Sequence, residues 1–81
     1  MSTETARASV QAALSRIAPE VDLDDVDPAA DLREEADLDS LDFLSLVEAL
    51  AADPGVEIPE SDYARVRSLD DLVGYLATHG A

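Results

Sequence analysis

Three stretches of the chain carry apolar residues at the three- and four-residue spacing of one helix face. The apolar positions are Ala6, Val10, Ala13, Leu14 and Ile17 in the first stretch, Phe43, Leu46, Val47 and Leu50 in the second, and Leu69, Leu72, Val73 and Leu76 in the third. This spacing predicts helices over 3–18, over 40 to about 52, and from 68 to about 80. Pro19 ends the first helix and Asp53-Pro54-Gly55 ends the second, because proline and glycine break helices.

The remaining segments predict one short helix and one long connection. Pro59 suits the first position of a short helix that ends near Ala64. The connection over 20–38 is rich in aspartate, and loops of this length in compact domains are often functional. We therefore predict an all-α fold, a small four-helix bundle of three longer helices and one short helix. A long loop joins the first two helices, and one domain is expected over 1–81.

A capped helix start follows the long connection. Asp39 is placed to cap the second predicted helix, because its carboxylate can accept hydrogen bonds from backbone N–H groups of the first turn. Asp42 falls at the third helical position, where an acidic side chain suits the positive end of the helix dipole. Advancing about 100° per residue puts Ser40 at the edge of the apolar face and Leu41 well away from it. The pattern predicts an exposed hydroxyl beside an exposed leucine, at a helix end that favours a phosphate ester.

Composition narrows the possible partners. The chain has 19 acidic and 5 basic residues, all five of them arginine, and a formal net charge of −14. Binding to nucleic acid or to an anionic membrane surface is disfavoured, because both need clustered cationic side chains. Basic surfaces of partner proteins are favoured instead, and long-range electrostatic steering should speed the encounter.

The cellular compartment is constrained as well. Cysteine is absent, which excludes disulfides, thiolate metal sites and cysteine nucleophiles. Residues 2–8 are polar and lack the apolar segment of a signal peptide, and no apolar run reaches membrane-spanning length. The expectation is a cytoplasmic protein that acts as a monomer.

Neither a catalytic serine nor a calcium loop fits the sequence. A serine nucleophile needs a base, yet the only histidine is His79, two residues from the end, and no glycine-flanked nucleophile motif surrounds Ser40. An EF-hand that begins at Asp22 needs glycine at its sixth position and glutamate at its twelfth, where this chain has Asp27 and Arg33. We expect no catalytic residue and no specific metal site, with at most loose divalent-cation binding to the crowded aspartates.

The motif Asp39-Ser40-Leu41, followed by Asp42, resembles the attachment motif of acyl carrier proteins. The likeness covers nearly the whole chain: a helix, a long loop, Asp-Ser-Leu, a second helix, Glu57-Ile58-Pro59-Glu60 and a last helix from Ser68. In that family the serine bears a 4′-phosphopantetheine arm whose thiol holds acyl groups as thioesters. The resemblance implies a carrier rather than an enzyme, with an arm that a phosphopantetheinyl transferase moves from coenzyme A to Ser40.

The resemblance also implies roles for the neighbours of Ser40. Asp39 and Leu41 flank the arm, and Asp39 would orient the loop and the helix start. The expected docking surface for acyl-transferring or acyl-modifying enzymes comprises Leu41, Asp42, Leu44, Ser45 and Glu48. Acyl chains can fold back between the helices in this family, and the candidate lining residues here are Phe43, Leu46 and Tyr63. Ordinary helix capping, peripheral packing and core packing explain the same residues equally well.

Several positions depart from the family pattern. Asp37 stands where a glycine is common in the family, two residues before the motif aspartate. It is expected to stiffen the segment of the chain that leads to the motif. The other departures are Ser45, Ala51 and Ala52 in place of acids, Glu48 in place of an apolar contact residue, and Pro54 in place of an aromatic or apolar residue. A second helix of lower acidity favours a specialised pathway, such as secondary metabolism, over housekeeping fatty-acid synthesis.

Two other functions stay open at this point. A carrier of aminoacyl or peptidyl groups would share the serine and the arm but would be loaded by an adenylating enzyme. An unmodified acidic interaction module, such as a nucleic-acid mimic, would need neither. The high acidity and the aspartate after Leu41 favour the acyl carrier.

Overall fold

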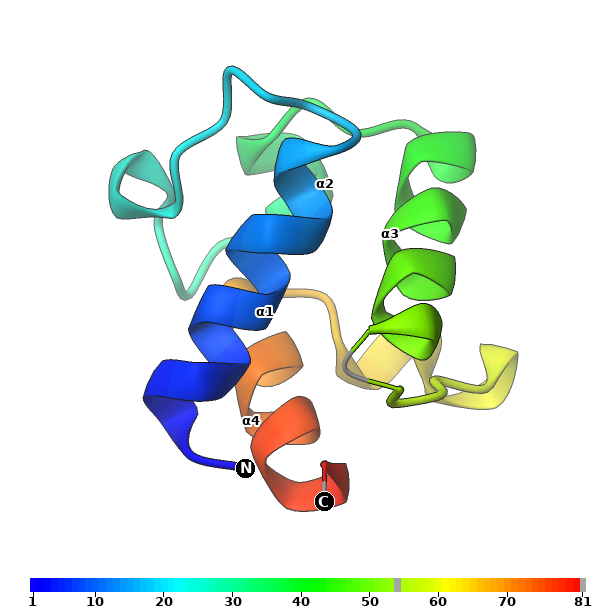
Figure 1. The fold of residues 1–81 in the computed structure, drawn as a ribbon. Coiled ribbons are helices and arrows are strands. Elements are labelled where there is room, and N and C mark those ends of the chain that lie inside the picture. Colours follow the sequence, from blue (N-terminus) through cyan, green and yellow to red (C-terminus); the bar gives the residue numbers. More distant parts are fainter. Residues whose placement is uncertain (54, 81) are drawn as a thin grey trace.

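The computed structural model describes residues 1–53 and 55–80. Its elements are α1 (Thr3–Ser15), η1 (Leu23–Asp25), α2 (Leu32–Glu35), α3 (Ser40–Ala52), η2 (Glu60–Arg65) and α4 (Leu69–His79), where η marks a 3-10 helix. Helix α1 packs against both α3 and α4 (Figure 1). The described residues form no strand, and the predicted all-α fold with three longer helices is confirmed.

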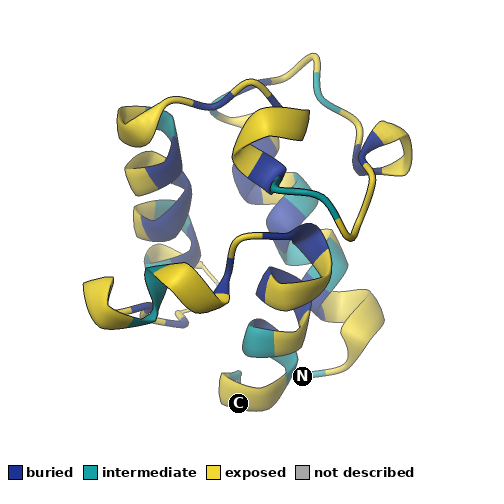
Figure 2. Cartoon of the chain, turned by 180° about the vertical axis from the view of Figure 1, so that it is seen from behind, coloured by how far each residue is buried: buried dark blue, intermediate teal, exposed yellow. Residues whose placement is uncertain are grey.

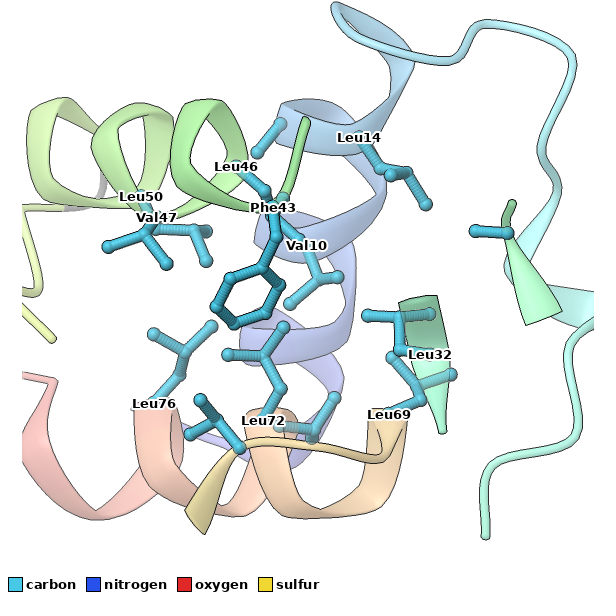
Figure 3. Packing of buried hydrophobic residues seen from close by; sticks show 14 of the residues in the cluster. Val10, Leu14, Leu32, Phe43, Leu46, Val47, Leu50, Leu69, Leu72 and Leu76 are labelled. Carbon is cyan, nitrogen blue, oxygen red and sulfur yellow. The ribbon is translucent and has the colours of Figure 1, made fainter. Parts of the chain in front are cut away.

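The apolar faces of the three long helices meet in one core (Figure 3). The largest fully buried side chains are Leu14, Leu32, Leu46, Leu50, Leu69, Leu72, Leu76, Val10 and Val66. Burying a leucine contributes roughly 1.5–3 kcal/mol relative to leaving it in water. Most of the apolar stripe predicted from the sequence therefore stabilises the fold directly.

Helix α1 ends earlier than the sequence predicts. It stops at Ser15 instead of Ala18, and Arg16 follows as the C-cap. The N–H groups of Ile17 and Ala18 both donate to the Leu14 carbonyl, over 3.0 and 2.8 Å. The chain thus tightens into a turn before Pro19, and Ile17 is left half-buried at the edge of the core.

The long connection is more ordered than a loop. It contains η1 and α2, which the sequence pattern did not predict. The Gln11 side chain braces it against α1: its amide nitrogen donates to the Val21 carbonyl over 3.2 Å, and its oxygen accepts from Leu23 N–H over 2.9 Å. Further along, Leu32 N–H donates to the Arg67 carbonyl over 2.7 Å. This last hydrogen bond fixes α2 against the segment that precedes α4.

The helix ends agree with the sequence in part. Ser68 caps α4 as predicted, accepting from Asp71 N–H over 3.0 Å. The short helix η2 is a 3-10 helix that begins at Glu60, so Pro59 occupies the cap position and not the first helical one. Pro54, part of the predicted stop after α3, lies outside the described residues.

Helix α1 begins and helix α4 ends at one end of the molecule, and α3 begins at the other (Figure 1). Gly80 caps α4 against Met1 so closely that a Cβ there would lie 2.6 Å from the Leu76 carbonyl oxygen and 2.9 Å from Met1 Cβ. The start of α3 is therefore remote from the start of α1 and the end of α4.

Candidate functional site

The start of α3 is held by a reciprocal cap. The Asp39 carboxylate accepts from Asp42 N–H over 2.8 Å, and the Asp42 carboxylate accepts from Asp39 N–H over 3.4 Å. This capping box satisfies two backbone donors at once and fixes the direction in which the chain enters the helix. The prediction that Asp39 caps the helix is confirmed.

Ser40 is the first residue of α3, and its side chain is exposed to solvent. Its hydroxyl oxygen accepts a hydrogen bond from an Arg33 guanidinium nitrogen over 3.1 Å. A guanidinium stays protonated and has no acceptor site, so Arg33 cannot take the hydroxyl proton. This contact therefore suits a hydroxyl that another protein activates, and not a serine nucleophile with its own base.

The turn before the site depends on one residue with a positive φ. Asp37 has φ +55°, and it follows Ala36, the C-cap of α2. Its N–H donates to the Glu34 carbonyl over 3.4 Å, and Leu38 N–H donates to the Arg33 carbonyl over 2.8 Å. This pair of bonds forms a Schellman motif, in which glycine is the usual residue at the left-handed position. The departure from glycine noted in the sequence thus falls where a side chain costs energy.

The outward face of α3 is exposed to water (Figure 2). Leu41 is 74 % exposed and Leu44 is 42 % exposed, and these two are the exposed large hydrophobic residues of the described chain. Ser45 and Glu48 are exposed as well, while Asp42 is half-buried and engaged in the cap. The residues expected to form a docking surface therefore lie at or near one accessible face.

Two adjoining hollows lie between Ser40, α2 and η2. The first, of about 350 Å³, is lined by Arg33, Ser40, Phe43, Leu44, Glu60 and Tyr63. The second, of about 260 Å³, shares three of these residues and is lined by Asp31, Arg33, Phe43, Tyr63, Ala64 and Arg67. The rings of Phe43 and Tyr63 meet edge to face, with centroids 5.5 Å apart and an interplanar angle of 81°.

The candidate lining residues divide in two. Phe43 and Tyr63 line both hollows, whereas Leu46 lines neither and is fully buried in the core. A larger hollow of about 800 Å³ lies between α1 and residues 19–24, with no residue of α3 in its lining. It is therefore separate from the Ser40 site.

The described residues offer neither a metal cluster nor a helix that could span a membrane. Residues 1–53 and 55–80 contain no group of three or more histidine, cysteine, aspartate or glutamate side chains placed to hold a metal ion. In the same residues, every helix is too short or too polar to cross a bilayer.

Comparison with known proteins identifies the class of this domain. The family model described as "Phosphopantetheine attachment site" matches residues 8–76, so the chain is a phosphopantetheine-binding carrier domain. Related chains include an acyl carrier protein of Rubrobacter xylanophilus, 34 % identical over 73 % of this chain and 73 % of its own length. One from Syntrophobacter fumaroxidans is 38 % identical over 75 % of each chain.

A further relative is acyl carrier protein 2, mitochondrial, of Arabidopsis thaliana, which is 37 % identical over 73 % of this chain. The match spans about half of that protein, 47 % of its length. The chain belongs to the acyl carrier protein family. Members of this family carry their cargo on 4′-phosphopantetheine and are not enzymes; a phosphopantetheinyl transferase modifies them, and partner enzymes act on the cargo.

Arg33 is the residue of this site that the sequence patterns did not reveal. In the sequence, Arg33 falls at the twelfth position of a calcium loop that does not fit, and it is the single basic residue between positions 17 and 64. A lone cation seven residues before the motif serine was the available signal. Only the fold shows that the turn at Asp37 brings the two side chains together.

Proposed function

We propose that Ser40 is the residue that carries the phosphopantetheine arm and that the chain presents acyl groups to partner enzymes. The observation that carries the proposal is the solvent-exposed Ser40 hydroxyl at the first position of α3. Helix N-termini favour anions, because backbone N–H groups and the helix dipole point toward them. An adjacent arginine and an adjoining hollow also fit a phosphate followed by a flexible chain.

The attachment would be a substitution at phosphorus, carried out on the transferase. The Ser40 oxygen would form a bond to the phosphorus of coenzyme A that bears pantetheine, and the pyrophosphate bridge would break. Adenosine 3′,5′-bisphosphate would leave, and the hydroxyl proton would pass to the transferase or to solvent. Arg33 cannot serve as the base, which supports activation by the partner.

The docking partners are enzymes with basic surfaces, which would meet Leu41 and Leu44 on the exposed face of α3. Asp42, Ser45 and Glu48 would complete this surface, and the charge of −14 would speed the encounter. Nucleic acid and membranes are not expected as partners. The low acidity of α3 supports a specialised pathway over primary fatty-acid synthesis. The relatives named acyl carrier protein support acyl over aminoacyl cargo.

Three broader expectations are part of the same proposal. They are that the residues 1–81 form one domain, that the protein acts as a monomer, and that it is located in the cytoplasm. One relative has "mitochondrial" in its name, so relatives of this chain are not all cytoplasmic by name.

Incubation with coenzyme A and a broad-specificity phosphopantetheinyl transferase tests the proposal. Intact-protein mass spectrometry should show that the wild type gains one arm and that Ser40→Ala gains none. Ser61→Ala is the matched control, because Ser61 is an exposed serine outside the expected docking surface, and it should be modified like the wild type. Modification of Ser40→Ala, or none of the wild type, would refute the proposal; the second result would favour an unmodified interaction module.

A further inference from the structure

We propose that Arg33 binds the phosphate of the arm and fixes its position at the start of α3. This inference rests on the function proposed above, because it requires an arm on Ser40. An Arg33 guanidinium nitrogen already lies 3.1 Å from Ser40 Oγ. After attachment the phosphorus would be bonded to that oxygen, so the free phosphate oxygens would lie two bonds from the atom that Arg33 contacts. The guanidinium would need little movement to donate to them.

The negative charges around Ser40 would repel a phosphate, and the contact with Arg33 would offset this repulsion. The carboxylates of Asp39 and Asp42 stand within one turn of Ser40, and Glu60 lines the adjoining hollow. A phosphodiester adds another negative charge to this group, and nearby like charges repel. Arg33 is the cation in hydrogen-bond contact with Ser40, and it can offset that repulsion.

The Arg33 side chain is also available to bind a phosphate, because no carboxylate in the described residues forms an ion pair with it. The ion pairs of the described residues join Arg7 to Asp24 and Arg67 to Asp31, and neither involves Arg33. A guanidinium presents a planar fork of donors that matches two phosphate oxygens at once. Bidentate donation to the free oxygens would replace the single bond that Arg33 now makes.

The position of Arg33 is set before any arm arrives. Its N–H donates to Asp31 Oδ1 over 2.9 Å, and its carbonyl accepts from Leu38 N–H over 2.8 Å. The guanidinium carbon lies 5.6 Å from the centroid of the Phe43 ring, within the range of a cation–π contact. Backbone and side chain are thus both oriented toward the start of α3, which lowers the entropy lost on phosphate binding.

The test compares the apo and arm-bearing forms of the wild type, Arg33→Ala, Arg33→Lys and Arg16→Ala. Arg16 is the matched control, because it is an exposed arginine at the end of α1 and lies outside both hollows. Mass spectrometry reports the arm, nitrogen–proton NMR follows solvent exchange of the Arg33 Nε–H, and phosphorus NMR follows the phosphodiester. In the wild type, attachment should slow Arg33 Nε–H exchange by about 1.4-fold to fivefold, the range of an exposed ion pair.

Arg33→Ala should shift the phosphorus resonance, whereas Arg16→Ala should leave it unchanged. Arg33→Lys should give an intermediate shift, because lysine retains the charge and loses the fork. If the wild type gains the arm but Arg33 Nε–H exchanges equally fast in both forms, the Arg33 inference alone is overturned. This comparison needs no variant, so it decides the question even if Arg33→Ala fails to fold. If the wild type gains no arm, both the proposed function and this inference are overturned.

Discussion

Asp39 and Asp42 cap each other at the start of α3, with each carboxylate accepting from the other residue's backbone N–H over 2.8 and 3.4 Å. Ser40 and Leu41 lie between them and need no part of their side chains for the cap. The hydroxyl and the apolar side chain are consequently left to solvent. One local motif therefore fixes the helix start and exposes the residues proposed to act there.

Removing this cap should destabilise the fold. Asp39→Ala leaves Asp42 N–H without its acceptor and should lower the free energy of unfolding by about 0.5–2 kcal/mol. Asp39→Asn should lose less, because asparagine is also a good cap. Urea denaturation followed by circular dichroism measures both. Equal stability of the wild type and Asp39→Ala would contradict the capping role.

At the left-handed turn, replacing Asp37 by glycine is not expected to lower the free energy of unfolding, in contrast to Asp39→Ala. Asp37→Gly removes roughly 1–2 kcal/mol of backbone strain from the folded state. Glycine also raises the conformational entropy of the unfolded chain, which lowers the free energy of unfolding by roughly 0.4–1 kcal/mol. The variant should therefore match the wild type or gain up to about 1.6 kcal/mol in the free energy of unfolding. Asp37→Val should lose stability, because a β-branched residue fits this conformation poorly.

The matched control for Asp37 is its neighbour Ala36, which has φ −97° and a buried methyl group. Ala36→Gly should lower the free energy of unfolding by about 0.5–1 kcal/mol or more. Thermal unfolding distinguishes the two positions. If glycine destabilised both positions equally, the positive φ at Asp37 would not be a source of strain.

Two leucines of α3 should respond to truncation in different ways. Leu46 is fully buried, and Leu46→Ala should cost about 2–5 kcal/mol of unfolding free energy through the lost contacts and the cavity. Leu41 is 74 % exposed, and Leu41→Ala should stay within about 0.5 kcal/mol of the wild type. Denaturant unfolding of the pair checks this, and similar losses would contradict the assigned exposures. Only Leu41→Ala is expected to weaken docking while leaving the fold intact.

Tyr75 should give a pH signature. Its hydroxyl donates to Asp62 Oδ2 over 2.8 Å, and this hydrogen bond, helped by partial desolvation and the nearby carboxylate charge, raises the pKa of Tyr75 above its ordinary value near 10. The hydrogen bond from Tyr75 contributes fully to stability below the pKa that Tyr75 has in the unfolded chain. This contribution is lost as the pH rises through the pKa of Tyr75 in the folded protein. Asp62→Asn should lower the Tyr75 pKa in an ultraviolet titration of tyrosinate. Tyr75→Phe identifies which of the two tyrosines moves, and superimposable wild-type and Asp62→Asn curves would exclude the contact.

The sequence predicted the parts of this structure that depend on local pattern. Apolar spacing identified the three long helices, and cap chemistry placed the start of α3 at Ser40, because both depend on residues within a few positions of each other. Helix α2 and η1 were missed, because four-residue and three-residue helices carry too little periodicity to recognise. They form because tertiary contacts hold them: Gln11 accepts from Leu23 N–H in η1, and Leu32 N–H in α2 donates to the Arg67 carbonyl.

The site was predictable to the same degree. Exposure of Ser40, Leu41, Ser45 and Glu48 follows from helical geometry alone. The contact between Arg33 and Ser40 does not, because it depends on the reversal of the chain at Asp37. Whether Leu46 or Phe43 faces the hollow likewise depends on where η2 packs, which periodicity within α3 cannot reveal.

The most direct measurement of the central claim is the position of the arm in the modified wild-type protein. Cleavage after arginine releases residues 34–65 as one peptide, which contains Ser40, Ser45 and Ser61. Fragmentation of that peptide by tandem mass spectrometry should place the whole phosphopantetheine mass on Ser40. An arm on Ser45, on Ser61 or on any other peptide would contradict the proposal that the start of α3 carries the cargo.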